Sequence, residues 1–304
     1  PVLFPRHGGE AMQWTPILTP ALLACAVAAA VPAAAQEMMH DQAMQAGQMP
    51  RHDWLPPGAD GALAALNASP RHGEWATVRL EDGDSVRSWV VYPERSGPAP
   101  VVVVIHEIYG LTNWIRAVTD RLAAAGFIAI APDLLTMEDV ATDAEGDPEQ
   151  QPAVAAVRGL DEDRVHRQIR AVAEYGMGLD AARPVYGITG FCWGGSTSFE
   201  HATRYADLMG AVPFYGGSPD EAGLAGVRVP VLGHYGGDDA RVNATIPRAE
   251  DALGGDYFPN IYDDAGHGFL RQQTGRDGAN HRASLQAWPM TIGFFRAAAF
   301  YAGS

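Results

Sequence analysis

Cys192 is the residue whose setting most clearly suggests chemistry, because it lies between Gly190 and Gly194 in the pattern G-x-C-x-G. Small residues two positions before and after a nucleophile let a strand turn directly into a helix, which lifts the reactive atom above the sheet. The N-terminus of that helix carries partial positive charge and free N–H groups, which favour a thiolate and can bind an oxyanion. The pattern therefore predicts a nucleophilic cysteine. Its alternative interpretation is a small, inert, buried cysteine in a glycine-rich turn.

A nucleophile at such a turn needs a base, and an acid that orients the base. Asp239 in HYGGDD (234–239) and His267 in DAGHGF (264–269) follow Cys192 in the chain order nucleophile, acid, base. We predict that the Cys192 thiolate attacks an acyl carbon, that His267 moves the protons and that Asp239 fixes the tautomer of His267. Asp238 is an alternative to Asp239, and the backbone N–H of Trp193 is a candidate oxyanion donor.

Alternating strands and helices surround these residues. Buried strands are predicted at 101–105, 127–131 and 185–189, and further strands at 210–215, 229–233 and 257–262. Helices are predicted at 113–125, 161–175, 247–253 and 281–301, with a kink or restart at Pro289 and a further helix that begins near Gly195. Residues 74–80 and 86–92 flank a DG turn and predict a hairpin. The chain is therefore predicted to be α/β, with an N-terminal β-hairpin and a mostly parallel central sheet that has helices on both faces.

The segment from Glu138 to Glu149 carries six carboxylates and no basic residue. Such a run is typical of a solvated excursion, and we interpret it as part of a lid.

Composition excludes several classes of function. The chain has 304 residues, a hydrophobic content of 47% and a formal net charge of -15. The negative charge argues against a nucleic-acid surface, which needs clustered basic side chains. All 21 basic residues counted as Lys or Arg are arginine, so pyridoxal-lysine, Schiff-base and phosphate-loop chemistry are excluded. We expect no cofactor.

The apolar run from Ile17 to Ala35 resembles a secretory signal peptide, so we predict residues 1–35 to be a signal peptide cleaved after Ala35. Pro16, Pro20 and Pro32 argue against a stable membrane span. An alternative is a lipoprotein, since LLAC (22–25) resembles a lipobox ending at Cys25. Cleavage after Ala35 would place the protein in the periplasm or outside the cell, with Cys192 as an unpaired thiol in an oxidising compartment.

Residues 36–68 are polar, methionine-rich and interrupted by proline and glycine, which predicts a flexible linker before a catalytic domain at 69–304. The methionines and histidines between Met38 and His52 could bind copper. No compact ligand spacing is present there, so we expect no metal site.

Together these motifs resemble the dienelactone hydrolase family of α/β-hydrolases. The matching segments are HEIYG (106–110), APDL (131–134), GFCWGG (190–195), FYGG (214–217), HYGGDD (234–239) and DAGHGFLR (264–271). The resemblance covers the chain from about Glu74 to its C-terminus, and it implies an α/β-hydrolase fold and hydrolysis of a small ester or lactone.

The resemblance also implies roles for further residues. Glu107 matches a carboxylate that takes the cysteine proton when substrate binds, so that the thiol rests largely unreactive. Ile108 would supply the second oxyanion N–H, Arg271 would pair with a substrate carboxylate, and Tyr215 would lie near the pocket. The family prototype has a second substrate-binding arginine before the helix that leads to the elbow. This chain has no arginine at 148–157, and Arg158 follows that stretch.

Two other classes of function remain as alternatives. An exported binding protein on a hydrolase scaffold would keep Cys192 without turnover. A glutamine-amidotransferase-like enzyme also uses G-x-C-x-G, but it pairs the cysteine with an H-x-E motif that HGF (267–269) lacks. We therefore favour a cysteine-dependent hydrolase whose partner is a small-molecule ester or lactone.

Overall fold

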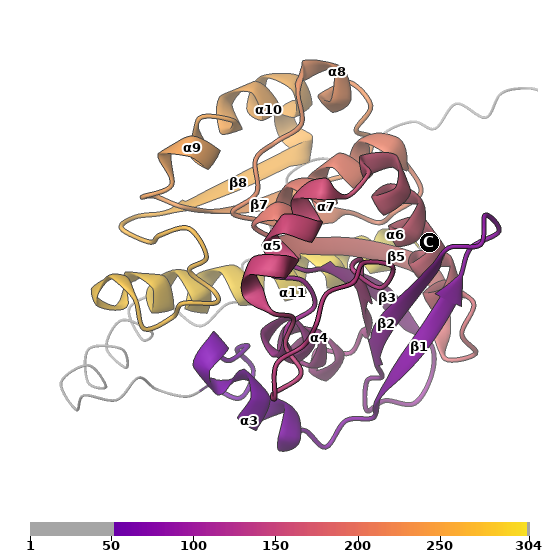
Figure 1. Ribbon diagram of the computed structural model, residues 1–304. Coiled ribbons are helices and arrows are strands. Elements are labelled where there is room, and N and C mark those ends of the chain that lie inside the picture. Colours follow the sequence, from indigo (N-terminus) through magenta and orange to yellow (C-terminus); the bar gives the residue numbers. More distant parts are fainter. Residues whose placement is uncertain (1–51, 303–304) are drawn as a thin grey trace, which may run out of the picture.

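A sheet of eight strands crosses the middle of the molecule in the computed structural model, which describes residues 52–302 (Figure 1). In spatial order the strands are β1 (Gly73–Arg79), β2 (Ser85–Val91), β4 (Ile128–Asp133), β3 (Ala99–Ile105), β5 (Ala182–Phe191), β6 (Ala211–Phe214), β7 (Val231–Gly236) and β8 (Tyr257–Tyr262). The pairs β1–β2 and β2–β4 are antiparallel, and every other pair is parallel. The predicted α/β fold, with its hairpin and mostly parallel sheet, is confirmed.

Helices cover both faces of the sheet, as predicted. Helices α4 (Asn113–Ala124) and α11 (Ala279–Ala302) pack on one face. Helices α6 (Glu162–Met177), α7 (Trp193–Arg204), α8 (Glu221–Leu224), α9 (Ala240–Asn243) and α10 (Ile246–Leu253) pack on the other. Along β3, Val102 and Val104 belong to the first core and Val101 and Val103 to the second. Both faces of β3 are therefore buried. This explains the uninterrupted apolar run at 101–105, because such a strand has no solvent-facing side on which polar residues would alternate.

The segment before the hairpin packs against the domain, whereas the sequence placed it in a flexible linker over 36–68. Residues 52–68 include η1 (Ala59–Gly61) and α3 (Ala62–Asn67), with Leu55 and Ala62 buried. The Trp114 indole N–H donates to the carbonyl of Pro57 at 3.0 Å. The backbone N–H of Ala59 donates to the carbonyl of Arg271 at 2.9 Å. The prolines and glycines therefore shape an irregular segment whose backbone groups are satisfied by the domain.

The acidic excursion leads into a helix that the sequence analysis did not predict, α5 (Gln150–Gly159). Its residues Ala153 and Val157 are buried against Leu135, and the partly buried Ile108 and Trp193 pack against the same cluster. The outer face of α5 is exposed, so this helix packs its apolar inner face over Leu135, Ile108 and Trp193. Helix α11 runs through Pro289 without the predicted restart.

None of the helices between residues 52 and 302 is long and apolar enough to span a membrane. The predicted signal peptide, the lipobox-like Cys25, the linker residues 36–51 and the methionines from Met38 to Met49 lie outside the described residues.

Candidate active site

Cys192 is the single residue between strand β5 and helix α7. Its φ is 57° and its ψ is -114°, a left-handed conformation that costs a non-glycine residue roughly 1–3 kcal/mol. The flanking glycines are required by close backbone approach. A Cβ on Gly190 would lie 1.9 Å from the carbonyl oxygen of Gly194, and a Cβ on Gly194 would lie 2.3 Å from that of His106. The sequence pattern thus reflects a sharp turn packed directly against the end of β3.

His267 and Asp239 lie together at the same edge of the sheet. Asp239 follows β7, His267 follows β8, and the ring Nδ1 of His267 is 2.5 Å from Oδ2 of Asp239. Asp239 is buried and His267 is about one-third exposed, with a side-chain relative exposure of 35%. Asp238, the alternative acid, is exposed and pairs with Arg276 instead. The structure therefore places Asp239, and not its neighbour, against the histidine.

The surroundings of His267 favour its protonated ring. Burial acts to lower its pKa, but the hydrogen bond to Asp239 and then the interaction with Cys192 outweigh burial and raise the pKa to about 10. The ring is hydrogen-bonded to Asp239 and lies close enough to the Cys192 thiol to interact with it. This is the arrangement expected of a histidine that carries protons to and from a thiol.

Glu107 lies two residues beyond the end of β3 and is buried, with a relative exposure of 3%. Burial raises its pKa to about 7, although Arg271 and His267 act in the opposite direction. The Nε of Arg271 lies 3.2 Å from Oε2 of Glu107, in an ion pair whose geometry does not form a hydrogen bond. Glu107 is thus a carboxyl that can hold or release a proton near neutral pH.

Tyr215 is fully buried at the end of β6, with a φ of 40°. Its ring centroid lies 5.2 Å from that of His267, and its hydroxyl has no hydrogen-bond partner among the described residues. Burial, followed by the charges of Glu107 and Cys192, raises the tyrosine pKa well above its usual value. A buried, unpaired hydroxyl is an available donor for a ligand in the site.

Trp193 and Ile108, the candidate oxyanion donors, lie on adjoining segments. Trp193 is the first residue of α7, so its N–H has no acceptor within the helix. Ile108 follows β3, which pairs with β5 through Ile105 and Gly190. Both side chains pack against the same small cluster under α5.

Arg271 is fixed from two sides. Its guanidinium lies 5.1 Å from the ring centroid of Tyr109, and its carbonyl accepts the N–H of Ala59. Arg158 is exposed on α5, so the structure does not bring it into the buried group around Cys192. A cavity of about 1120 Å³ borders Arg271, but it opens between the 52–71 segment, α4 and residues 271–275, and it is not lined by Cys192 or His267.

Sequence reasoning missed two residues around this group. His106 is fully buried and stacks on Trp193 at a centroid distance of 5.4 Å. Asn280 accepts the N–H of Gly266 at 2.9 Å and so holds the loop before His267. The HEIYG motif contained a signal for His106, whereas nothing in the sequence linked Asn280 to a loop 14 residues earlier.

The chain is similar to known proteins over most of its length. A family model described as the dienelactone hydrolase family matches residues 86–299. A Salmonella typhimurium protein provisionally named carboxymethylenebutenolidase is 30% identical over 230 residues, which span 70% of this chain and 83% of that protein. An Escherichia coli K12 protein with the same provisional name is 32% identical over 204 residues, which span 62% and 74%. A solved structure from Klebsiella pneumoniae, provisionally identified as a dienelactone hydrolase, has a TM-score of 0.60 at 26% identity and covers 77% of this chain and 99% of its own.

Proposed function

The chain belongs to the dienelactone hydrolase family, and from that premise we propose that it is a carboxylic ester hydrolase that cleaves a small ester or lactone through an acyl-enzyme on Cys192. The observation that carries the proposal is the hydrogen-bonded pair of Asp239 and His267 beside Cys192, which lies at the strained turn before α7. Strain at a single residue that also presents a nucleophile is a recognised feature of catalytic turns.

The first step in the proposed reaction is release of the thiol proton. In the resting site Glu107 pairs with Arg271. A substrate carboxylate that binds Arg271 would take over this pairing, which removes an influence that lowers the pKa of Glu107. Glu107 then accepts the proton of the Cys192 thiol. This order keeps the thiol unreactive until substrate arrives.

The thiolate attacks the acyl carbon, and the C–O bond to the leaving oxygen breaks. The His267 imidazolium gives its proton to the leaving alkoxide, and the backbone N–H groups of Trp193 and Ile108 hold the oxyanion. Water then attacks the thioester as His267 takes a proton from it. The carboxylic acid leaves, and the Cys192 thiolate recovers its proton from Glu107. Asp239 keeps the ring of His267 oriented throughout.

The surroundings of the site support a small substrate with one anionic group. Arg271 is the cation beside Glu107, and the covering helix α5 presents Ala153 and Val157 toward the cluster that includes Ile108. The proposed substrate therefore places a carboxylate at Arg271 and an apolar part under α5.

A panel of lactones and esters, including cis- and trans-dienelactone and p-nitrophenyl acetate, tests the proposal with wild type, Cys192→Ala and Cys192→Ser. We expect turnover by wild type, none by the alanine variant and little by the serine variant, because the site is arranged for a thiol. Arg271→Met should raise KM for carboxylate-bearing lactones but not for p-nitrophenyl acetate. Wild-type rates in Cys192→Ala would contradict the mechanism. Labelling of Cys192 by iodoacetamide without turnover of any member would favour a binding protein.

We also propose that the protein is exported, on the basis of the apolar run from Ile17 to Ala35. N-terminal sequencing of the protein recovered from periplasm or medium should begin at Gln36. A palmitoylated N-terminal Cys25 would instead identify a lipoprotein.

A further inference from the structure

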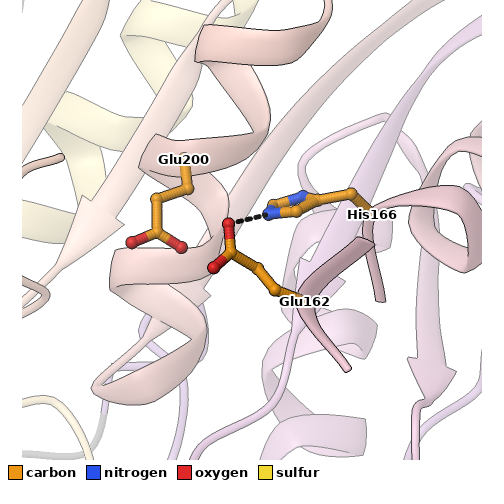
Figure 2. A group of neighbouring side chains, drawn as sticks. All are labelled: Glu162, His166 and Glu200. Carbon is orange, nitrogen blue, oxygen red and sulfur yellow. Dashed lines mark ion pairs between the residues drawn. The ribbon is translucent and has the colours of Figure 1, made fainter. Parts of the chain in front are cut away.

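Three side chains that could ligate a metal converge between helices α6 and α7, away from Cys192. Figure 2 shows Glu162 and His166, one turn apart on α6, facing Glu200 of α7, and their ligand atoms all lie within 4.8 Å of one another. We propose that these three residues form a binding site for a divalent first-row transition-metal cation such as Zn²⁺. No metal site was predicted from the sequence, where only the residues between Met38 and His52 were considered as ligands. Glu200 lies far along the chain from Glu162 and His166.

His166 is the observation that points to a ligand. Its side chain has a relative exposure of 1%, and its Nε2 has no hydrogen-bond partner among the described residues. This atom lies 4.0 Å from Oε1 of Glu162, which is too far for a hydrogen bond. Buried ring nitrogens are normally satisfied, so an orphaned Nε2 that faces two carboxylates needs a partner. A cation between the three residues would provide it.

The other nitrogen of His166 already has the support that a metal ligand requires. Nδ1 of His166 lies 3.3 Å from Nδ1 of His201, and Nε2 of His201 lies 3.2 Å from the hydroxyl of Tyr186. Hydrogen bonds along this chain can run in either direction. When His166 donates from Nδ1, His201 donates to Tyr186 and the Nε2 of His166 presents its lone pair to the carboxylates. Histidine ligands commonly hold their tautomer by such an outer hydrogen bond.

The two carboxylates differ in exposure. Glu200 is half-buried and Glu162 is mostly exposed, and both place a ligand oxygen within 4.8 Å of the His166 ring nitrogen. Oε1 of Glu162, the oxygen 4.0 Å from Nε2 of His166, also accepts a hydrogen bond from Arg204 at 2.6 Å, so a metal would share this carboxylate with Arg204. Arg204 is therefore a neighbouring positive charge that the cation must tolerate, and Asp163 balances it through a second contact at 2.6 Å.

One imidazole nitrogen and two carboxylate oxygens suit Zn²⁺, Mn²⁺ or Fe²⁺, whereas Mg²⁺ prefers oxygen ligands and retained waters. Tetrahedral Zn²⁺ at about 2.1 Å from its ligands would separate them by about 3.4 Å. The exposed side chain of Glu162 can rotate to close the difference from the present spacing.

The site would join two helices and take no direct part in hydrolysis. Glu200 follows Cys192 by eight residues, which is about 12 Å along the axis of α7. A bound cation would fix α7 to α6 and so brace the helix that begins at Cys192.

The test is calorimetric titration of chelator-treated full-length Cys192→Ala protein with Zn²⁺, alongside melting temperature measured with Zn²⁺ or Mg²⁺. The alanine background removes the thiol, which could itself bind Zn²⁺. We expect Zn²⁺, but not Mg²⁺ at equal concentration, to raise Tm. Glu200→Gln should lose one binding equivalent or bind it at least about tenfold more weakly. Glu221→Gln, an exposed carboxylate change on α8, should match the parent.

Co²⁺ provides a second measurement that keeps the proposal falsifiable where His166→Gln fails to fold. Visible d–d absorption of bound Co²⁺ should appear in the parent and fall in Glu200→Gln. Equal Zn²⁺ stoichiometry, affinity and Tm response in the parent and Glu200→Gln would overturn the site, as would absence of any Zn²⁺-dependent rise in Tm in the parent.

Discussion

His267 and His166 are both next to carboxylates, but their surroundings move their pKa values in opposite directions. Asp239 is buried and hydrogen-bonds to His267 at 2.5 Å, and the histidine pKa rises to about 10. Glu162 is mostly exposed, pairs with Arg204 and lies 4.0 Å from His166, whose pKa falls to about 4. A nearby carboxylate alone therefore does not determine whether a histidine pKa rises or falls. The direct hydrogen bond to buried Asp239 suits His267 to carry protons. His166 has no such bond to Glu162, so its ring can offer a lone pair instead.

The strongest way to test this contrast is to exchange each histidine for glutamine. His267→Gln should lower kcat by about 10⁴- to 10⁶-fold, because no other group relays protons to the leaving oxygen and water. His166→Gln should change kcat by less than about tenfold but lose the Zn²⁺-dependent rise in Tm. His72→Gln, at an exposed position, is the matched control for both. Comparable losses of kcat in the first two variants would refute the separation of roles.

Asp239→Asn sharpens the comparison by removing the charge that distinguishes the two sites. We expect kcat to fall by about 10³- to 10⁴-fold and the pKa of His267 to drop from about 10. Asp238→Asn breaks only the exposed pair with Arg276, so it should leave kcat within about twofold and the pKa of His267 unchanged. Ring-proton NMR titration and steady-state kinetics report the two effects. A histidine pKa unchanged in Asp239→Asn would show that the carboxylate does not control the ring.

The smallest expected effect is on stability, where Glu107→Gln should change the pH dependence of unfolding in addition to its loss of the proton acceptor for Cys192. The folded-state pKa of about 7 lies above the ordinary glutamic acid value of 4.5, so ionisation of this buried acid destabilises the folded state. This destabilisation of the folded state is absent below pH 4.5, grows between pH 4.5 and pH 7, and is complete above pH 7. Glu107→Gln should therefore be more stable than wild type above pH 7 by on the order of 1–3 kcal/mol, and equal to it near pH 4. Urea unfolding across this range measures the difference, and parallel curves for the two proteins would contradict it.

The candidate site was largely predictable because its signals are local. G-x-C-x-G predicts the elbow, since each glycine excludes a Cβ from neighbouring backbone. The loops carrying Asp239 and His267 were placed by the strands before them. The choice between Asp238 and Asp239 was not predictable from the sequence. The two are adjacent and chemically identical, and the turn after β7 determines which side chain points toward His267.

Other features depend on tertiary contacts that leave little trace in the sequence. The 52–68 segment resembles a linker in composition, yet its backbone groups are bonded to Arg271, Trp114 and Gln273. Helix α5 starts beside Pro152 in an alanine-rich stretch without strong periodicity. The spacing of Glu162 and His166 places them on one helical face, but only packing of α7 on α6 brings Glu200 to them.

The central claim is that Cys192 becomes acylated during turnover. Wild-type protein mixed with p-nitrophenyl acetate and quenched with acid within the first turnover should gain the mass of one acetyl group, located by peptide mapping at Cys192. In Asp239→Asn the acetyl adduct should form more slowly and should also be hydrolysed more slowly. Cys192→Ala should not form it. Turnover without any adduct on Cys192, or an adduct only on another residue, would contradict the account.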